Sequence, residues 1–157
     1  EVRGANVFIG YWNMPEKTKA ELRDDGFFIT GDLGKFDEDG YLHIVGRDKD
    51  LIISGGYNIY PKELEMFLDE QECVLESAVI GVPNADFGET PLALIVPQEG
   101  KIPNLTQIKE NIEKEIARFK HPRQLIVIKN LPRNTMGKVQ KNLLREQYNN
   151  IFEVSKS

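Results

Sequence analysis

The first third of the chain divides its apolar residues into short runs separated by glycine and aspartate. This pattern is typical of short strands and tight turns. The clearest element is a hairpin, in which strands 33–36 and 41–45 flank a turn whose Asp39-Gly40 pair provides the positive backbone angles that such a turn needs. The elements expected ahead of this hairpin are a strand over 2–12, a helix over 14–22 and a strand over 26–30.

After residue 50 the apolar runs lengthen. An apolar strand over 51–53 ends at Ser54-Gly55-Gly56, and Asn104 with Gln107 three residues later resembles a capping box at a helix start. The further elements expected are a helix from 61, strands over 75–82 and 91–96, a helix with an apolar stripe from 105 to 119, a strand over 125–128 and a helix over 139–148. This order predicts a small α+β domain with a three-stranded sheet flanked by helices.

Composition limits the classes of protein to consider. The chain has 157 residues, of which 40% are hydrophobic and 29% charged, so it is long enough to bury a core. No apolar run approaches the ~20 residues of a membrane helix, and we expect no membrane partner. One cysteine and two histidines make an internal disulfide framework or a metal site within this chain unexpected and fit a reducing, cytoplasmic setting.

The net charge of −5 conceals an asymmetry along the chain. Residues 1–100 hold 8 basic and 20 acidic side chains, whereas residues 101–157 hold 12 basic and 5 acidic ones. The basic part fits a phosphate-bearing ligand, and it fits a solvated basic surface equally well. Nucleic acid is not expected as a partner, because the basic residues are scattered and few aromatic residues lie among them.

Two turn segments place charged groups where they can bind a ligand. Asp32 follows a strand and Gly31, where a carboxylate can accept hydrogen bonds from the vicinal hydroxyls of a ribose. Arg47 opens the charged connector 47–50, and its guanidinium provides a planar set of donors for ribose or phosphate. Taken alone, each segment also fits an ordinary surface turn, and Asp32 then caps its own turn.

A third segment, 132–138, ends in Gly137-Lys138. A lysine in an exposed loop can place its ammonium beside a phosphate or a developing carboxylate charge. The spacing of a Walker phosphate loop is absent. Taken alone, Lys138 also fits a solvated lysine.

Together these segments resemble the C-terminal motifs of the acyl-adenylate-forming superfamily, which includes acyl-CoA synthetases, peptide-synthetase adenylation domains and beetle luciferases. The segments that carry the resemblance, in order along the chain, are 26–32, 46–65, 86–89 and 131–139. The resemblance covers residues 1–148. It implies that residues 1–46 end the N-terminal adenylation domain, that 47–50 form a hinge, and that 51–157 form a mobile C-terminal domain.

The resemblance also implies roles for single residues. Asp32 and Arg47 would bind the ribose of ATP or acyl-AMP, and Lys49 would be the hinge residue about which the C-terminal domain rotates. Lys138 would be the catalytic residue, bridging the carboxylate and the α-phosphate. The strand that carries Gly55 and Gly56 would face the active site in the thioester step, where missing side chains leave room for the pantetheine arm of CoA.

The function that the resemblance implies is that of an acid–CoA ligase. ATP, a carboxylic acid and CoA would give acyl-CoA, AMP and pyrophosphate through an acyl-AMP, with Mg²⁺ required. The acyl pocket and the phosphate loop of the family lie in its N-terminal domain, so we expect this chain to be part of a longer polypeptide and inactive alone. That N-terminal domain would be its partner.

Segments 10–12, 14–18, 24–30 and 134–136 are similar to those of bacterial malonyl-CoA synthetases, which makes malonate the expected acid. A medium-chain fatty or aryl acyl-CoA ligase is the alternative enzyme. A non-catalytic module that binds a nucleotide or CoA is the alternative of another class.

Overall fold

The computed structural model describes residues 1–152. The chain divides into two compact units between Lys49 and Asp50, and each unit is described by itself. Among the described residues, no helix has both the length and the apolar character needed to cross a membrane.

The first unit contains one helix and one hairpin. Helix α1 runs over Pro15–Glu21 with its proline in the first turn, as the sequence predicts. Strands β1 (Asp32–Phe36) and β2 (Leu42–Arg47) pair antiparallel, which confirms the predicted hairpin. Asp37 shapes the turn, because its Oδ1 accepts hydrogen bonds from the backbone N–H groups of Asp39 and Tyr41 at 3.1 and 2.8 Å.

The predicted strands over 2–12 and 26–30 are wrong. Only isolated bridges form here, and they join Phe28 to Val2 and to Leu22. The chain turns early, since the Val7 N–H donates to the Gly4 carbonyl, and Gly10 at φ +151° departs from a strand conformation. The turn at residues 4–7 and the conformation of Gly10 therefore each interrupt the strand expected over 2–12.

The second unit is built on a mixed sheet. Its strands are β3 (Ile52–Ser54), β4 (Tyr57–Ile59), β5 (Val74–Asn84), β6 (Gly88–Pro97) and β7 (Gln124–Val127). They run in the order β4-β3-β6-β5, and β7 pairs parallel to β6. The predicted sheet of three strands is corrected to five, because β3 and β4 form a short hairpin that joins β6 at Ser54 and Gly88. The α+β class is confirmed.

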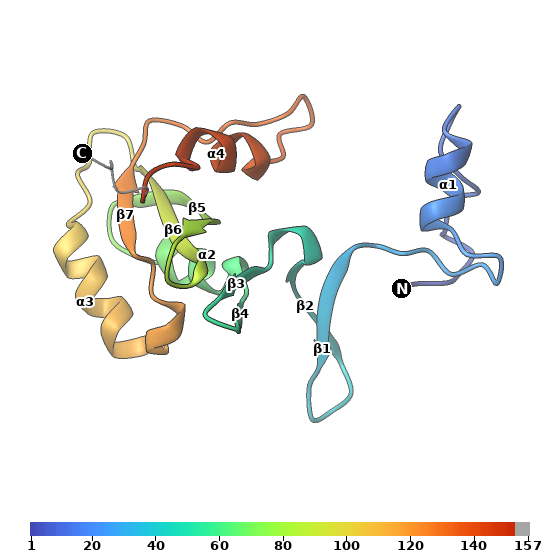
Figure 1. Cartoon of the computed structure of the whole chain (residues 1–157), viewed down its shortest axis with the longest axis horizontal. Coiled ribbons are helices and arrows are strands. Elements are labelled where there is room, and N and C mark those ends of the chain that lie inside the picture. The colour runs from blue at the N-terminus through green and yellow to red at the C-terminus, as the bar shows by residue number, and fades with distance from the viewer. Residues whose placement is uncertain (153–157) are drawn as a thin grey trace. The chain divides into compact units, whose positions relative to one another are not determined.

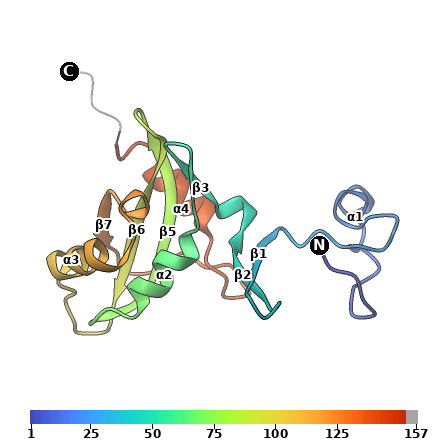
Figure 2. The ribbon, with the colours of Figure 1, turned by 90° about the horizontal axis from the view of Figure 1, so that it is seen from below.

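The helices of the second unit cover both faces of the sheet. They are α2 (Pro61–Asp69), α3 (Leu105–Glu115) and α4 (Lys141–Tyr148), with a short 3-10 turn η2 (Arg118–Lys120). A further 3-10 turn, η1 (Asp48–Asp50), contains the boundary between the two units. Strands β5 and β6 alternate: Val79 and Ala93 face α2 and α3, whereas Ile80 and Leu94 face α4. Figure 1 and Figure 2 show the long strands between these helices.

Helix α3 begins as the sequence predicts and ends earlier. The Asn104 Oδ1 accepts a hydrogen bond from the Gln107 N–H at 3.1 Å, which confirms the N-cap. The helix stops at Glu115, and Ile116 is extended, although the apolar stripe continues to Phe119. Phe119 instead lies in the turn η2, with its ring 4.9 Å from that of Tyr57.

Candidate functional site

Lys138 lies near the end of an arm formed by residues 131–140, between β7 and α4 (Figure 1). The arm folds back on itself: the Asn134 N–H donates to the Lys138 carbonyl at 2.9 Å and the Gln140 N–H to the Pro132 carbonyl at 2.8 Å. Gly137 makes the return at φ +77°, a conformation that favours glycine.

The middle of the arm is exposed to solvent. Leu131 at its base is buried and Val139 packs against the core, but residues 133–138 are all exposed. Within the described part of the chain, no hydrogen bond or ion pair engages the Lys138 ammonium. The arm can therefore present this charge to a group outside the second unit.

Asp32 and Arg47 meet in the first unit. They are directly opposite each other across the β1–β2 ladder, and the Arg47 Nε lies 3.0 Å from the Asp32 Oδ1. Arg47 Nη1 also donates to the Thr30 carbonyl at 2.6 Å. The register of the hairpin thus fixes a carboxylate and a guanidinium side by side, a combination suited to hydroxyl groups.

Lys49 lies in η1, where the first unit ends. The next residue, Asp50, forms an ion pair with Arg145 of α4. The first residue of the second unit is therefore tied to the helix that directly follows the Lys138 arm.

Gly55 and Gly56 do not lie on a strand, which corrects the predicted placement. They form the two-residue turn between β3 and β4, with φ +56° and +83°. A two-residue turn with both angles positive matches the twist of a hairpin, and two glycines adopt it without strain. The Gly55 N–H donates to the Phe87 carbonyl at 2.9 Å, which fixes the turn against the β5–β6 connection.

An open pocket of about 810 Å³ adjoins this turn. The tilted rings of Tyr57 and Phe119 line it together with Arg118 and Arg123. Aromatic faces beside guanidinium groups suit a ligand that carries both a flat ring and phosphates.

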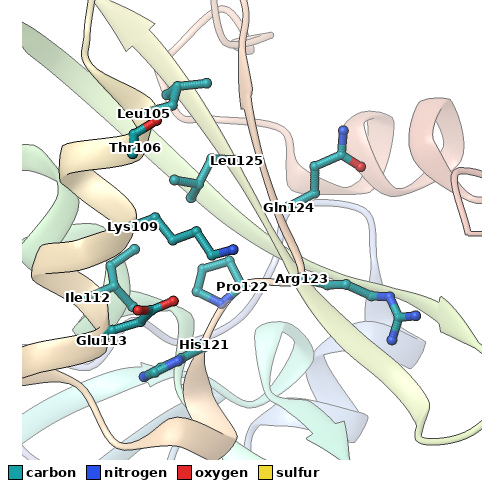
Figure 3. Close-up of a pocket in the computed structure, with 10 residues that line it drawn as sticks. All are labelled: Leu105, Thr106, Lys109, Ile112, Glu113, His121, Pro122, Arg123, Gln124 and Leu125. Atoms are coloured by element: carbon teal, nitrogen blue, oxygen red, sulfur yellow. The ribbon is translucent and has the colours of Figure 1, made fainter.

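A second pocket of about 430 Å³ lies between α3 and β7 (Figure 3). Lys109 extends from α3 toward Pro122, and Glu113 lies on the same helix. This pocket contains none of the candidate site residues named from the sequence. Lys109 and Glu113 carry opposite charges, so the lining does not favour a ligand of either charge.

Two ion pairs made by helix α4 were missed by sequence reasoning. Lys141 at the start of α4 pairs with the nearly buried Glu65 of α2 at 2.6 Å, and Arg145 pairs with Asp50. The sequence signal was two basic residues four apart on one helix, but it did not identify their acidic partners.

No group of three or more His, Cys, Asp and Glu side chains within residues 1–152 is arranged to hold a metal ion.

Residues 63–138 match the family model of the AMP-binding enzyme C-terminal domain. Among curated proteins, the chain is 43% identical over 145 residues to the indoleacetate–CoA ligase of Aromatoleum aromaticum, covering 92% of this chain and 28% of that protein. The chain spans about 28% of the length of the curated relatives that it matches first.

Solved structures are also similar to this chain over most of its length. ATP-bound MatB from Rhodopseudomonas palustris is 58% identical, with a TM-score of 0.85 over 96% of this chain and 30% of that one. The o-succinylbenzoate CoA synthetase of Bacillus subtilis, in complex with its acyl-adenylate intermediate, is 35% identical, with a TM-score of 0.84 over 91% of this chain and 29% of that one.

Proposed function

The chain carries the C-terminal domain of the AMP-binding enzymes, as found in acyl-CoA synthetases, and from this membership we propose that it works within an acid–CoA ligase. The observation that supports this most directly is the exposed Lys138 on its anchored arm. The other half of the enzyme would be an N-terminal domain of the same polypeptide.

The reaction proceeds in two steps. A carboxylate oxygen attacks the α-phosphorus of ATP, and pyrophosphate leaves to give acyl-AMP; the sulfur of CoA then attacks the acyl carbon, and AMP leaves. The Lys138 ammonium lies between the carboxylate and the α-phosphate in the first step and stabilises the charge of the transition state. When bound with ATP, Mg²⁺ neutralises phosphate charge.

Asp32 and Arg47 hold the nucleotide in this proposal. The Asp32 carboxylate accepts hydrogen bonds from the ribose hydroxyls, and Arg47, fixed by its bond to the Thr30 carbonyl, keeps that carboxylate oriented. Positioning of this kind contributes to rate because the reacting groups are held together before the reaction begins.

The proposed division of the chain is into two domains joined by a hinge. Residues 1–46 end the N-terminal domain, 47–50 with Lys49 are the hinge, and 51–157 are the C-terminal domain. Rotation about the hinge exchanges Lys138 for the Gly55-Gly56 turn at the active site, so one site serves both steps.

The Gly55-Gly56 turn serves the CoA step. Without side chains it leaves room for the pantetheine arm, and the adjoining pocket, lined by Tyr57, Phe119 and Arg123, suits the nucleotide end of CoA.

Malonate is the proposed acid. The support is the similarity of segments 10–12, 14–18, 24–30 and 134–136 to bacterial malonyl-CoA synthetases, beside the 58% identity with ATP-bound MatB. The 43% identity with an indoleacetate–CoA ligase keeps an aryl acid as the alternative, beside a medium-chain fatty acid.

The test uses the full-length protein and follows the two half-reactions separately. Lys138→Ala should lower adenylation, measured by pyrophosphate release, by about 100-fold or more, while thioester formation from supplied acyl-AMP stays near the unmodified rate. The matched control is Lys129→Ala, which removes another exposed lysine. An equal loss in both steps would show that the role given to Lys138 is wrong.

The same assay identifies the substrate when ATP and CoA are combined with malonate, medium-chain acids or aryl acids. Pyrophosphate release with longer or aryl acids and none with malonate would reject malonate. Tight binding of AMP or CoA by the full-length protein with no turnover of any acid would favour a binding module instead.

A further inference from the structure

Both polar atoms of the peptide group that joins Gly137 to Lys138 are held by side chains of the arm itself. The Gly137 carbonyl accepts a hydrogen bond from Arg133 Nη1 at 2.6 Å. The Lys138 N–H donates to the Asn134 Oδ1 at 2.9 Å. The orientation of this one peptide plane is thus fixed from both sides.

The two holding side chains are themselves fixed. Arg133 Nη2 forms an ion pair with Glu76 of β5, so the guanidinium links the tip of the arm to the central sheet. The Asn134 Oδ1 also accepts a hydrogen bond from the Met136 N–H at 3.0 Å, which closes a tight turn around the same oxygen.

This peptide group needs such support because of its neighbours. Gly137, at φ +77°, can reach many backbone conformations, and a change in its φ or ψ would turn the following backbone and redirect the Cα–Cβ bond of Lys138. The arm is exposed from 133 to 138, so no packed core opposes such a change. Backbone hydrogen bonds hold the peptide groups on either side, whereas the two polar atoms of this peptide group are held by side chains.

We propose that Arg133 and Asn134 are positioning residues that aim Lys138 at the reacting phosphate by fixing the Gly137–Lys138 peptide plane. The proposal rests on the function proposed above for Lys138. It assigns the two residues no contact with substrate: they act through the backbone of the lysine. A misplacement of about 1 Å in such a group can reduce a rate by about 100-fold.

The experiment compares Asn134→Ala, Asn134→Asp and Arg133→Met in the full-length protein, with Lys138→Ala measured alongside. Asn134→Ala and Arg133→Met should slow adenylation by about 10-fold to 100-fold. Thioester formation from supplied acyl-AMP should stay within about twofold of the unmodified rate. Asn134→Asp keeps the accepting oxygen and should restore most of the adenylation rate.

Thr135→Ala is the matched control within the arm, since within residues 1–152 its side chain makes no hydrogen bond. Amide hydrogen exchange of the peptide that contains Lys138 provides a readout independent of activity. Exchange should accelerate in Asn134→Ala and not in Thr135→Ala.

The outcomes separate the two proposals. If Lys138→Ala abolishes adenylation while Asn134→Ala and Arg133→Met keep the unmodified rate, the positioning role is overturned and the function of Lys138 stands. If the variants slow both half-reactions equally, their role is merely structural and the inference fails. If Lys138→Ala leaves adenylation intact, both proposals fall.

Discussion

The ion pair between Lys141 and Glu65 offers the sharpest test of how the Lys138 arm is anchored. The Lys141 Nζ lies 2.6 Å from the Glu65 Oε1, and the side chains are only 16% and 10% exposed. The same Glu65 oxygen accepts a hydrogen bond from the Val79 N–H of β5 at 2.9 Å. The carboxylate thus links α4, which follows the arm, to α2 and the sheet.

Lys141→Met removes the cation and leaves the Glu65 carboxylate buried with one backbone donor. Breaking a buried pair by removing one partner costs about 3–5 kcal/mol. Both side chains keep a little contact with water, so we expect the lower end, about 3 kcal/mol of unfolding free energy. At about 4 °C per kcal/mol this lowers Tm by about 12 °C.

Urea and thermal unfolding of the chain measure the effect. Lys129→Met makes the same substitution at an exposed lysine and should change stability by less than about 0.5 kcal/mol. Glu65→Gln added to Lys141→Met removes the unpaired charge but keeps an acceptor for the Val79 N–H, and should restore most of the loss. A loss below about 1 kcal/mol, or no recovery in the double variant, would refute the reasoning.

Two further predictions concern a glycine turn and an acid-sensitive hairpin. Gly56→Ala places a side chain at φ +83° with no atom within 4 Å of the new Cβ, so it should cost about 1–2 kcal/mol by backbone strain alone. It should also slow the thioester step while adenylation stays unchanged; slowing of adenylation alone would contradict the assignment. The hydrogen bonds from His43 and then from the Tyr41 N–H hold the pKa of Asp37 below its ordinary value of 3.8. The stability that they provide is present above that value and lost as pH falls through the lower pKa of the folded state, so Asp37→Asn should flatten the acid part of the stability curve, measured by unfolding at successive pH values. An unchanged acid slope would show that this carboxylate is not responsible.

Local signals in the sequence predicted much of the fold correctly. The hairpin turn and the Asn104 cap depend on residues only a few positions apart, so much of their chemistry can be read from the chain itself. Of the Asp39-Gly40 pair, only Gly40 takes the positive φ that was expected, at +83°. The apolar runs over 75–82 and 91–96 predicted the strands β5 and β6 for the same reason. The strand expected over 2–12 failed because a strand needs a partner ladder, and the apolar pattern alone does not provide one.

The candidate site residues were identified from the sequence, but their spatial arrangement was not. Lys138 was singled out by its glycine-preceded loop, and Asp32 and Arg47 were identified separately, but only the hairpin register shows that the two are paired. Their proposed roles come from the resemblance to the acyl-adenylate-forming enzymes.

By itself, the sequence determined the α+β order of elements, the capped helix start and the segments that contain the candidate site residues, because these depend on neighbours along the chain. Only the tertiary structure decided which distant charges meet, such as Lys141 with Glu65 and Arg133 with Glu76. The physical reason is that an ion pair depends on distance in space, and the folding of α4 and the arm onto the sheet sets that distance.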